Sequence, residues 1–251
     1  MSEIMLEAKG ITFYYPDSPN QKIIDGVSFK AQKGEFISLI GPSGCGKSTL
    51  LRILAKLIMP VSGEVIYKGK PLYAPTSEIS FVFQDFALLP WLTNIENVEV
   101  GLSNSALGDQ EKKRRAEEAL EKMGLESVAS YYPNALSGGM KQRVGIARAI
   151  VSNPNVLLMD EPFSSLDELT ANALREDVVY MLKSSDISVN SVIMVTHNVE
   201  EAVEMSDNIL VLSNKPTRIK QEIPIKLGYP RNRHSKAFMA AVDRIYELLT
   251  K

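Results

Sequence analysis

This sequence of 251 residues contains a single cysteine, has a net charge close to zero and lacks long apolar runs. Its single cysteine, Cys45, cannot form a disulfide within the chain, which fits a reducing compartment such as the cytosol. A formal net charge of −2 gives no sign of a nucleic-acid partner. No apolar run approaches the roughly 18 residues of a membrane span, and the first residues lack a basic region followed by an apolar one. We therefore expect a soluble protein that is not exported and does not bind nucleic acid.

Residues 41–49 fit the pattern G-x-x-x-x-G-K-[ST] in the context that this motif requires. Residues 36–40 read as a short buried strand, and leucines and isoleucines recur at helical spacing over 50–57. The motif consists of Gly41, Pro42, Ser43, Gly44, Cys45, Gly46, Lys47, Ser48 and Thr49. In such a loop the backbone N–H groups cradle a polyphosphate, Lys47 reaches the β- and γ-phosphates, and Ser48 offers its hydroxyl to Mg²⁺. The sequence therefore predicts a nucleotide-binding site.

Polar residues follow three other predicted strands at the point where each strand ends. These strands and the residues after them are 79–83 with Gln84, 155–159 with Asp160 and Glu161, and 191–196 with His197. In α/β proteins, catalytic groups lie at the carboxyl ends of buried strands. Paired with a phosphate loop, Asp160 would hold Mg²⁺ and Glu161 would accept a proton from an attacking water. Strands separated by helical stretches indicate a mostly parallel sheet with covered faces.

The remaining segments divide into strand-rich and helical parts, and with 45% hydrophobic residues the chain can bury a core. Further strands are expected at 4–8, 11–15, 23–30, 63–68 and 208–212. Helices are expected at 92–101, at 110–123 with Ala116, Ala119, Leu120 and Met123 inward, and near the C-terminus with Phe238, Val242, Ile245 and Leu249 on one face. Four basic residues at 112–115 are followed by two glutamates, which favours a solvated helix face.

Three features allow more than one interpretation. Cys45 is either a tolerated small residue or a thiol made reactive by the helix start after it. Tyr14 and Tyr15 would point to opposite faces of a strand, and the outward one either packs on the sheet or stacks on adenine. The apolar stretch 86–92 contains the single tryptophan, Trp91, and is either the core of a helical part or a surface for a partner.

A second glycine-rich helix start follows at Ser137, Gly138 and Gly139. An apolar helical pattern runs on from it to residue 150, which predicts backbone N–H groups that face an anion. A single nucleotide does not ordinarily need two such cradles. The octapeptide Leu-Ser-Gly-Gly-Met-Lys-Gln-Arg at 136–143 therefore narrows the class of phosphate-loop protein.

The motifs together, in their order along the chain, resemble the ATP-binding cassette of ABC transporters. The set comprises the phosphate loop, Gln84, the octapeptide, Leu-Leu-Met-Asp-Glu-Pro at 157–162, Ser-Ser-Leu-Asp at 164–167 and Thr196 with His197. The resemblance implies an α/β phosphate-loop NTPase with a RecA-like core and mostly parallel sheet, an N-terminal antiparallel β subdomain and an inserted helical subdomain. It divides the chain into an ATPase domain at 1–225, with 1–85 and 150–225 as core and 86–149 as helical subdomain, and a C-terminal helical tail at 226–251.

The resemblance also implies the roles of the site residues. Two cassettes would close head to tail around two ATP molecules, with Ser137, Gly138 and Gly139 of one copy facing the γ-phosphate held by Lys47 of the other. The further roles carried over are adenine stacking by Tyr15, sensing of Mg²⁺ and water by Gln84, Mg²⁺ association by Asp160, general base catalysis by Glu161, a dimer-crossing contact by Asp167 and γ-phosphate contact by His197.

The implied partners are a second copy of the chain, integral membrane permease subunits and, indirectly, an external substrate-binding protein. The chain would then lie on the cytoplasmic face of the cell membrane.

Leu-Leu-Pro-Trp at 88–91 and Tyr-Pro-Arg at 229–231 resemble importers of nitrate, sulfonates and taurine, and 86–92 would border the groove that receives a permease helix. The alternatives are an exporter or lipoprotein-release ATPase and a soluble assembly ATPase. Repair and translation ATPases would need a long coiled coil or a second cassette, and a plain phosphate-loop kinase or GTPase would lack the octapeptide.

Overall fold

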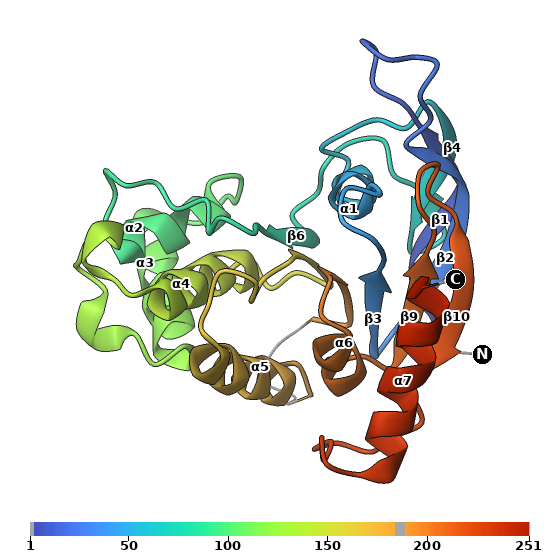
Figure 1. The fold of residues 1–251 in the computed structure, drawn as a ribbon. Coiled ribbons are helices and arrows are strands. Elements are labelled where there is room, and N and C mark those ends of the chain that lie inside the picture. The colour runs from blue at the N-terminus through green and yellow to red at the C-terminus, as the bar shows by residue number, and fades with distance from the viewer. Residues whose placement is uncertain (1–2, 184–188, 251) are drawn as a thin grey trace. The chain divides into compact units, whose positions relative to one another are not determined.

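The computed structural model describes residues 3–183 and 189–250 and divides into two compact units. The first unit comprises Met1–Pro75 and Asn190–Lys251, and the second comprises Thr76–Val189. Each unit is described by itself below. Figure 1 labels the helices α1 to α7 and the strands β1 to β4, β6, β9 and β10.

An antiparallel sheet in the first unit has the strand order β2-β1-β4-β5. Its strands are β1 (Ile4–Phe13), β2 (Ile24–Gln32), β4 (Ser62–Tyr67) and β5 (Lys70–Pro71). The prediction of two strands over 4–15 was wrong, because β1 is continuous and absorbs the break in alternation through register shifts beside Gly10, whose φ is 62°. Tyr14 and Tyr15 follow this strand and are not part of it.

The second sheet contributes four strands to the first unit, in the order β10-β9-β3-β8. These strands are β3 (Glu35–Ile40), β8 (Ser191–Thr196), β9 (Asn208–Leu212) and β10 (Ile219–Pro224), and the helices of the unit are α1 (Lys47–Leu54), α6 (Val199–Met205) and α7 (Lys236–Thr250). β3 pairs in parallel with both β8 and β9, and β10 runs antiparallel to β9. The predicted face of the C-terminal helix is confirmed, since Phe238, Val242 and Ile245 of α7 are buried with residues of α6 and β9.

Where the second unit is described, it combines two parallel strands with four α-helices. They are β6 (Ile79–Val82), β7 (Val156–Asp160), α2 (Asn94–Glu99), α3 (Asp109–Lys122), α4 (Gly138–Ile150) and α5 (Glu168–Lys183), with short 3₁₀ turns at Val100–Leu102, Glu126–Val128 and Pro133–Ala135. The four inward residues predicted for the helix at 110–123 are all buried. Its basic run is a solvated face, because Arg114 and Arg115 pair with Glu111 and Glu118 along the helix.

The arrangement confirms the predicted fold class, with parallel β strands, an antiparallel N-terminal sheet and a helical segment inserted between the strands. Across the described residues, no helix has both the length and the apolar character needed to cross a membrane.

Candidate nucleotide-binding site

The phosphate-loop motif connects β3 to α1 in the first unit. Gly44 and Gly46 have φ angles of 71° and 120°, in the left-handed region that residues with a Cβ rarely adopt. A Cβ added at Gly46 would also lie 2.8 Å from Cγ2 of Ile23. The two glycines therefore let the loop turn tightly while its backbone stays uncovered by side chains.

Lys47, the first residue of α1, is held over this loop. Its Nζ donates hydrogen bonds to the carbonyl oxygens of Gly41 at 2.8 Å and Pro42 at 3.1 Å. The residue is only 5% exposed. Its ammonium group is thus fixed beside the backbone of the loop, where a polyphosphate would need a cation.

The start of α1 suits an anion. Within the described residues, no side chain caps this helix, and its first turn contains no acidic residue. The first turns of α4 and α7 also lack acids, whereas those of α2, α3, α5 and α6 each contain one or two. Because uncapped N–H groups and the helix dipole attract negative charge, the loop and α1 together fit the phosphates of a nucleotide.

Tyr15 lies beside the start of α1. Its hydroxyl is 3.2 Å from Oγ1 of Thr49, and its ring packs edge-on against Phe13 with centroids 5.0 Å apart. Tyr15 is 43% exposed, while Tyr14 is partly covered. The exposed tyrosine is therefore the one that can offer a ring to a base near the phosphate loop.

His197 leaves the sheet at the same edge as the phosphate loop. It directly follows Thr196, the last residue of β8, which pairs with Ile40, the last residue of β3. The carboxyl ends of these neighbouring parallel strands therefore carry the loop on one and the histidine on the other. The His197 side chain is exposed.

The back of the phosphate loop rests on the turn between β9 and β10. Thr217 in this turn is fully buried, and its hydroxyl donates to the carbonyl oxygen of Cys45. Its backbone N–H donates to the carbonyl of Ile23 at 2.8 Å, and its carbonyl accepts from the N–H of Asp25 at 3.0 Å. Thr217 therefore joins the loop to the beginning of β2, a contact for which the residue pattern offers no signal.

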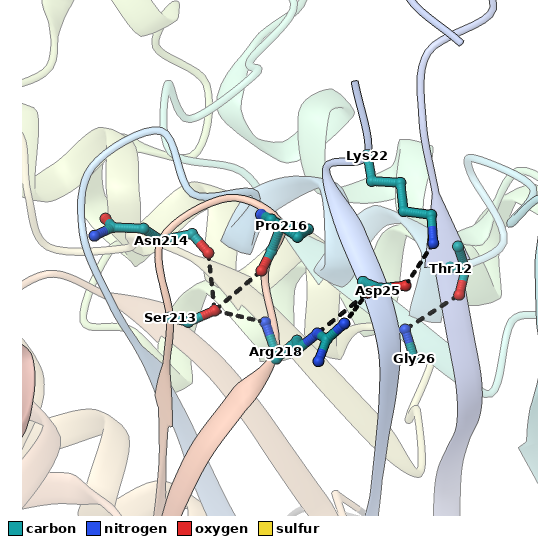
Figure 2. A network of polar contacts seen from close by, with 8 residues as sticks. All are labelled: Thr12, Lys22, Asp25, Gly26, Ser213, Asn214, Pro216 and Arg218. Carbon is teal, nitrogen blue, oxygen red and sulfur yellow. Dashed lines mark hydrogen bonds and ion pairs between the residues drawn. The ribbon is translucent and has the colours of Figure 1, made fainter. Parts of the chain in front are cut away.

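Figure 2 shows how this turn is itself fixed. The Ser213 hydroxyl donates to the carbonyl oxygen of Pro216 at 3.1 Å and accepts from the N–H of Arg218 at 2.9 Å. The guanidinium of Arg218 donates to the carboxylate of Asp25, which also accepts from Nζ of Lys22 at 3.0 Å. Hydrogen bonds from Arg218 and then Lys22 lower the pKa of Asp25. The turn is thus tied both internally and to β2.

In the second unit, β6 and β7 carry another set of predicted residues to one edge. The two strands are parallel neighbours with Val82 opposite Met159, so Gln84 and Asp160 lie at the same end of the pair. Asp160 is 2% exposed at the end of β7. Glu161 follows with a φ of 45°, a left-handed conformation. For a residue with a side chain this costs on the order of 1 kcal/mol or more, and such strain is concentrated at functional positions.

Ser164 connects Gln84 to the backbone of Glu161. Its hydroxyl donates to the carbonyl oxygen of Glu161 at 3.0 Å and lies 3.5 Å from Nε2 of Gln84. The sequence predicted roles for the other two residues and none for Ser164. Its position three residues after Glu161 was the available signal, because a serine hydroxyl reaches the carbonyl at that spacing.

The loop after Gln84 is fastened to α4. Phe86 and Ala87 both have left-handed backbone, with φ angles of 62° and 46°. The guanidinium of Arg148 donates to their carbonyl oxygens at 2.8 Å and 2.6 Å. Burial lowers the pKa of Arg148, but a guanidinium stays charged at any ordinary pH. Sequence reasoning missed Arg148, which fixes the position of this loop on α4.

The second predicted anion site, at residues 137–139, forms the start of α4. Ser137 caps the helix, since its hydroxyl accepts the backbone N–H three residues later at 3.3 Å. Gly138 is exposed, while Gly139 is buried, and a Cβ there would lie 2.4 Å from Cγ2 of Thr170. The carboxylate of Asp167 accepts the N–H of Thr170 at 3.0 Å, and hydrogen bonds from Thr170 lower its pKa. The glycine pair and Asp167 are therefore neighbours in the second unit.

Residues 24–164, more than half of the chain, match the family described as ABC transporter. The chain belongs to the ABC transporter family. An uncharacterized ABC transporter ATP-binding protein of Methanocaldococcus jannaschii is 38% identical over 248 residues, which cover 98% of this cassette and 92% of that protein. The aliphatic sulfonates import ATP-binding protein SsuB of Bacillus cereus is 42% identical over 226 residues, which cover 90% of the cassette and 88% of the relative. The predicted resemblance to importer cassettes is confirmed.

A solved structure of the dimeric ATP-binding cassette MJ0796, in a post-hydrolysis state with ADP and Pi, has the same fold. It superposes with a TM-score of 0.76 at 32% identity, covering 89% of this cassette and 100% of that chain. The present cassette is therefore an ATPase, and ATP is its nucleotide.

We expect Thr217→Val to weaken ATP binding by the cassette about five- to tenfold. The nearly isosteric valine removes a buried hydrogen bond worth about 1 kcal/mol and leaves the carbonyl of Cys45 unsatisfied behind the loop. Calorimetric titration with ATP measures the change. Thr217→Ser retains the hydroxyl and serves as the control. Equal ATP affinities in the two variants would show that this hydrogen bond does not position the phosphate loop.

Proposed function

We propose that this cassette powers a membrane importer of small organic anions of the sulfonate class. The observation that carries the proposal is the 42% identity, over 90% of the chain, to a protein named for aliphatic sulfonate import. Nitrate and taurine are related small anions and are the nearest alternatives. An exporter ATPase, or a soluble ATPase of an assembly pathway, is the alternative outside import.

In this proposal the chain divides the work of hydrolysis among a few side chains. The phosphate loop and Lys47 hold the β- and γ-phosphates, and Tyr15 stacks on adenine. Glu161 accepts a proton from the attacking water, which Gln84 orients. His197 contacts the γ-phosphate and stabilises the charge that develops there.

Mg²⁺ fits the donors that these motifs offer. Bound with ATP, the ion would supply positive charge that offsets the charge of the phosphates. The hydroxyl of Ser48, the carboxylate of Asp160 and the amide oxygen of Gln84 are hard oxygen ligands of the kind that Mg²⁺ prefers. In the described ranges no three His, Cys, Asp or Glu side chains gather into a metal site.

In a head-to-tail homodimer, the glycine-rich start of α4 would bind the nucleotide of the other copy. In it, Ser137, Gly138 and Gly139 of one copy approach the γ-phosphate bound by the other, and Asp167 reaches across the interface. The support is the MJ0796 cassette, whose post-hydrolysis state with ADP and Pi is dimeric. The absence of acidic residues from the first turn of α4 agrees with an anion at this helix start.

The loop around Trp91 is our proposed docking site for a permease. Trp91 is 70% exposed, so its side chain is not part of the core of the described chain. The loop is built on Asn97, which is fully buried. The Asn97 amide binds the N–H of Leu89 at 2.7 Å and donates to the carbonyls of Leu89 and Leu92, each at 3.1 Å. A rigid loop with an outward tryptophan suits contact with an apolar partner surface.

We expect Trp91→Ala to weaken permease binding at least tenfold, because a buried aromatic anchor contributes about 2 kcal/mol or more to an interface. ATP hydrolysis by the isolated cassette would be unchanged. Co-purification with permease in detergent measures binding of each variant, and the fluorescence of Trp91 is followed in a separate titration of the wild-type chain. Tyr180→Ala removes another aromatic side chain of the second unit, 80% exposed on α5, and is the matched control. Unchanged fluorescence on docking would contradict the proposed surface.

The proposal as a whole is tested by purifying the tagged chain from gently solubilised native membranes and identifying the attached proteins by mass. Recovery of a multi-span protein supports a peripheral subunit on the cytoplasmic face of the membrane. The external binding protein that serves the same transporter is then titrated with alkanesulfonates, taurine and nitrate, and sulfonate binding is expected. Soluble partners alone, with ATPase activity intact, would overturn the importer and favour an assembly ATPase.

A further inference from the structure

The segment 229–233, which we call the C-terminal strap, binds the end of helix α6. The hydroxyl of Tyr229 donates to the carbonyl oxygen of Met205, the last residue of α6, at 2.6 Å. Arg231 donates to the carbonyl oxygens of Val203 and Ser206. The last carbonyls of a helix have no partner within it, so the strap satisfies groups that would otherwise be left open.

Arg231 is buried for this purpose. Its side chain is 1% exposed. The guanidinium lies 4.2 Å from the centroid of the Tyr229 ring and 3.8 Å from the carboxylate of Asp207. A buried charge is tolerated only where partners surround it, and the planar guanidinium fixes the direction of each donor. The contact is therefore specific in geometry as well as in charge.

Asp207 ties the same point to β3. Its carboxylate accepts the N–H of Phe36 at 2.9 Å, and its own N–H donates to the carbonyl of Phe36 at 2.7 Å. The Tyr229 hydroxyl lies 3.3 Å from the same carboxylate. One cluster thus holds the strap, the end of α6 and the first residues of the strand that leads to the phosphate loop.

His197 lies at the other end of α6. Asn198, the next residue, caps the helix by accepting the N–H of Glu201 at 3.1 Å, and its own N–H donates to Oγ1 of Thr196 at 3.0 Å. The helix has seven residues and is mostly buried, with Val199, Glu201, Ala202, Val203 and Met205 in the core. A helix of this length spans about 10 Å and moves as one body. Fixing its C-terminal end therefore restricts the residue that precedes its N-terminal end.

We propose that Tyr229 and Arg231 are positioning residues, which hold α6 in place and thereby set the orientation of His197. The inference rests on the proposed contact between His197 and the γ-phosphate. It gives the Tyr-Pro-Arg string a physical task, where the sequence offered only a resemblance. Neither side chain touches the nucleotide in this proposal.

The test uses the full chain and the imidazole signals of its two histidines. His234→Gln leaves His197 as the single histidine, so its ring resonance is assigned without ambiguity. In that background we compare Arg231→Met, Tyr229→Phe and the control Arg244→Gln, which alters an exposed arginine of α7. ATP affinity, turnover per folded molecule and the His197 resonance are measured for each.

We expect Arg231→Met to shift or broaden the His197 resonance and to lower turnover about tenfold. ATP affinity should stay within about twofold of the parent, because a small misplacement of a γ-phosphate contact impairs the reaction more than it impairs binding. Tyr229→Phe removes only a hydroxyl, so we expect a smaller shift of the His197 resonance. This variant tests the role of the strap if Arg231→Met does not fold. An unchanged resonance and turnover in both variants, with only a lower melting temperature, would overturn the proposal. His197→Ala separates the two hypotheses: normal turnover in that variant would refute the γ-phosphate role, whereas the ring resonance still decides the role of the strap.

Discussion

Glu161→Gln is expected to slow ATP hydrolysis by about 10²- to 10⁴-fold, the range that a positioned general base contributes. Glutamine has nearly the shape of glutamate but cannot accept the proton of the attacking water. Binding of ATP should persist, because the phosphate loop and Lys47 are unchanged. The variant should therefore accumulate as an ATP-bound dimer, which single-turnover hydrolysis and light scattering would measure.

The left-handed backbone of Glu161, with φ at 45°, makes glutamine the right substitution. A β-branched residue would add strain at this conformation, and glycine would relax it, so either would mix a backbone effect with the chemical one. Glu176→Gln is the control, since Glu176 is an exposed carboxylate on α5 in the same unit. Wild-type turnover in the Glu161 variant would show that another group takes the proton.

Local pattern was sufficient for the elements that carry the motifs. The strand predicted at 36–40 is β3, and the helix predicted at 110–123 is α3, with its four inward residues buried. Both succeed because the periodicity of burial is a property of neighbouring residues. The same holds for the ends of β7 and β8, where buried runs stop at Asp160 and before His197.

Contacts between distant segments could not be predicted in this way. Thr217 and Cys45 are 172 positions apart, and Arg148 is 62 positions from Phe86. The carbonyl that Thr217 or Arg148 binds depends on how the strands and helices pack, and the local residue pattern does not determine that packing. The end of α6 illustrates the point, because the Arg231 that caps it lies beyond two further strands of the chain.

Gly138→Glu should reduce ATP hydrolysis at least a hundredfold while the fold and ATP binding persist. A Cβ at Gly138 meets Cδ2 of Leu166 at 3.4 Å, which is ordinary contact. A glutamate in the first turn of α4 also interacts favourably with the helix dipole, by about 0.3 to 1 kcal/mol, so the variant should melt no lower than the wild type. Its carboxylate would, however, occupy the surface proposed for the γ-phosphate of the second copy. Thermal melting, ATP titration and turnover measure the three effects, and normal turnover would contradict the second cradle.

Mixing Gly138→Glu with Lys47→Ala tests whether each site is shared between two copies. Lys47→Ala loses the phosphate contact but retains an intact start of α4, and the other variant is its complement. In a head-to-tail dimer of one copy of each, both defects meet in one site and the other site is intact. Random assortment makes about half of the dimers mixed, so independent sites predict about a quarter of the wild-type rate, although each variant alone is nearly inactive. A rate no higher than that of the separate variants would contradict independent shared sites, because no intact pair would then have formed.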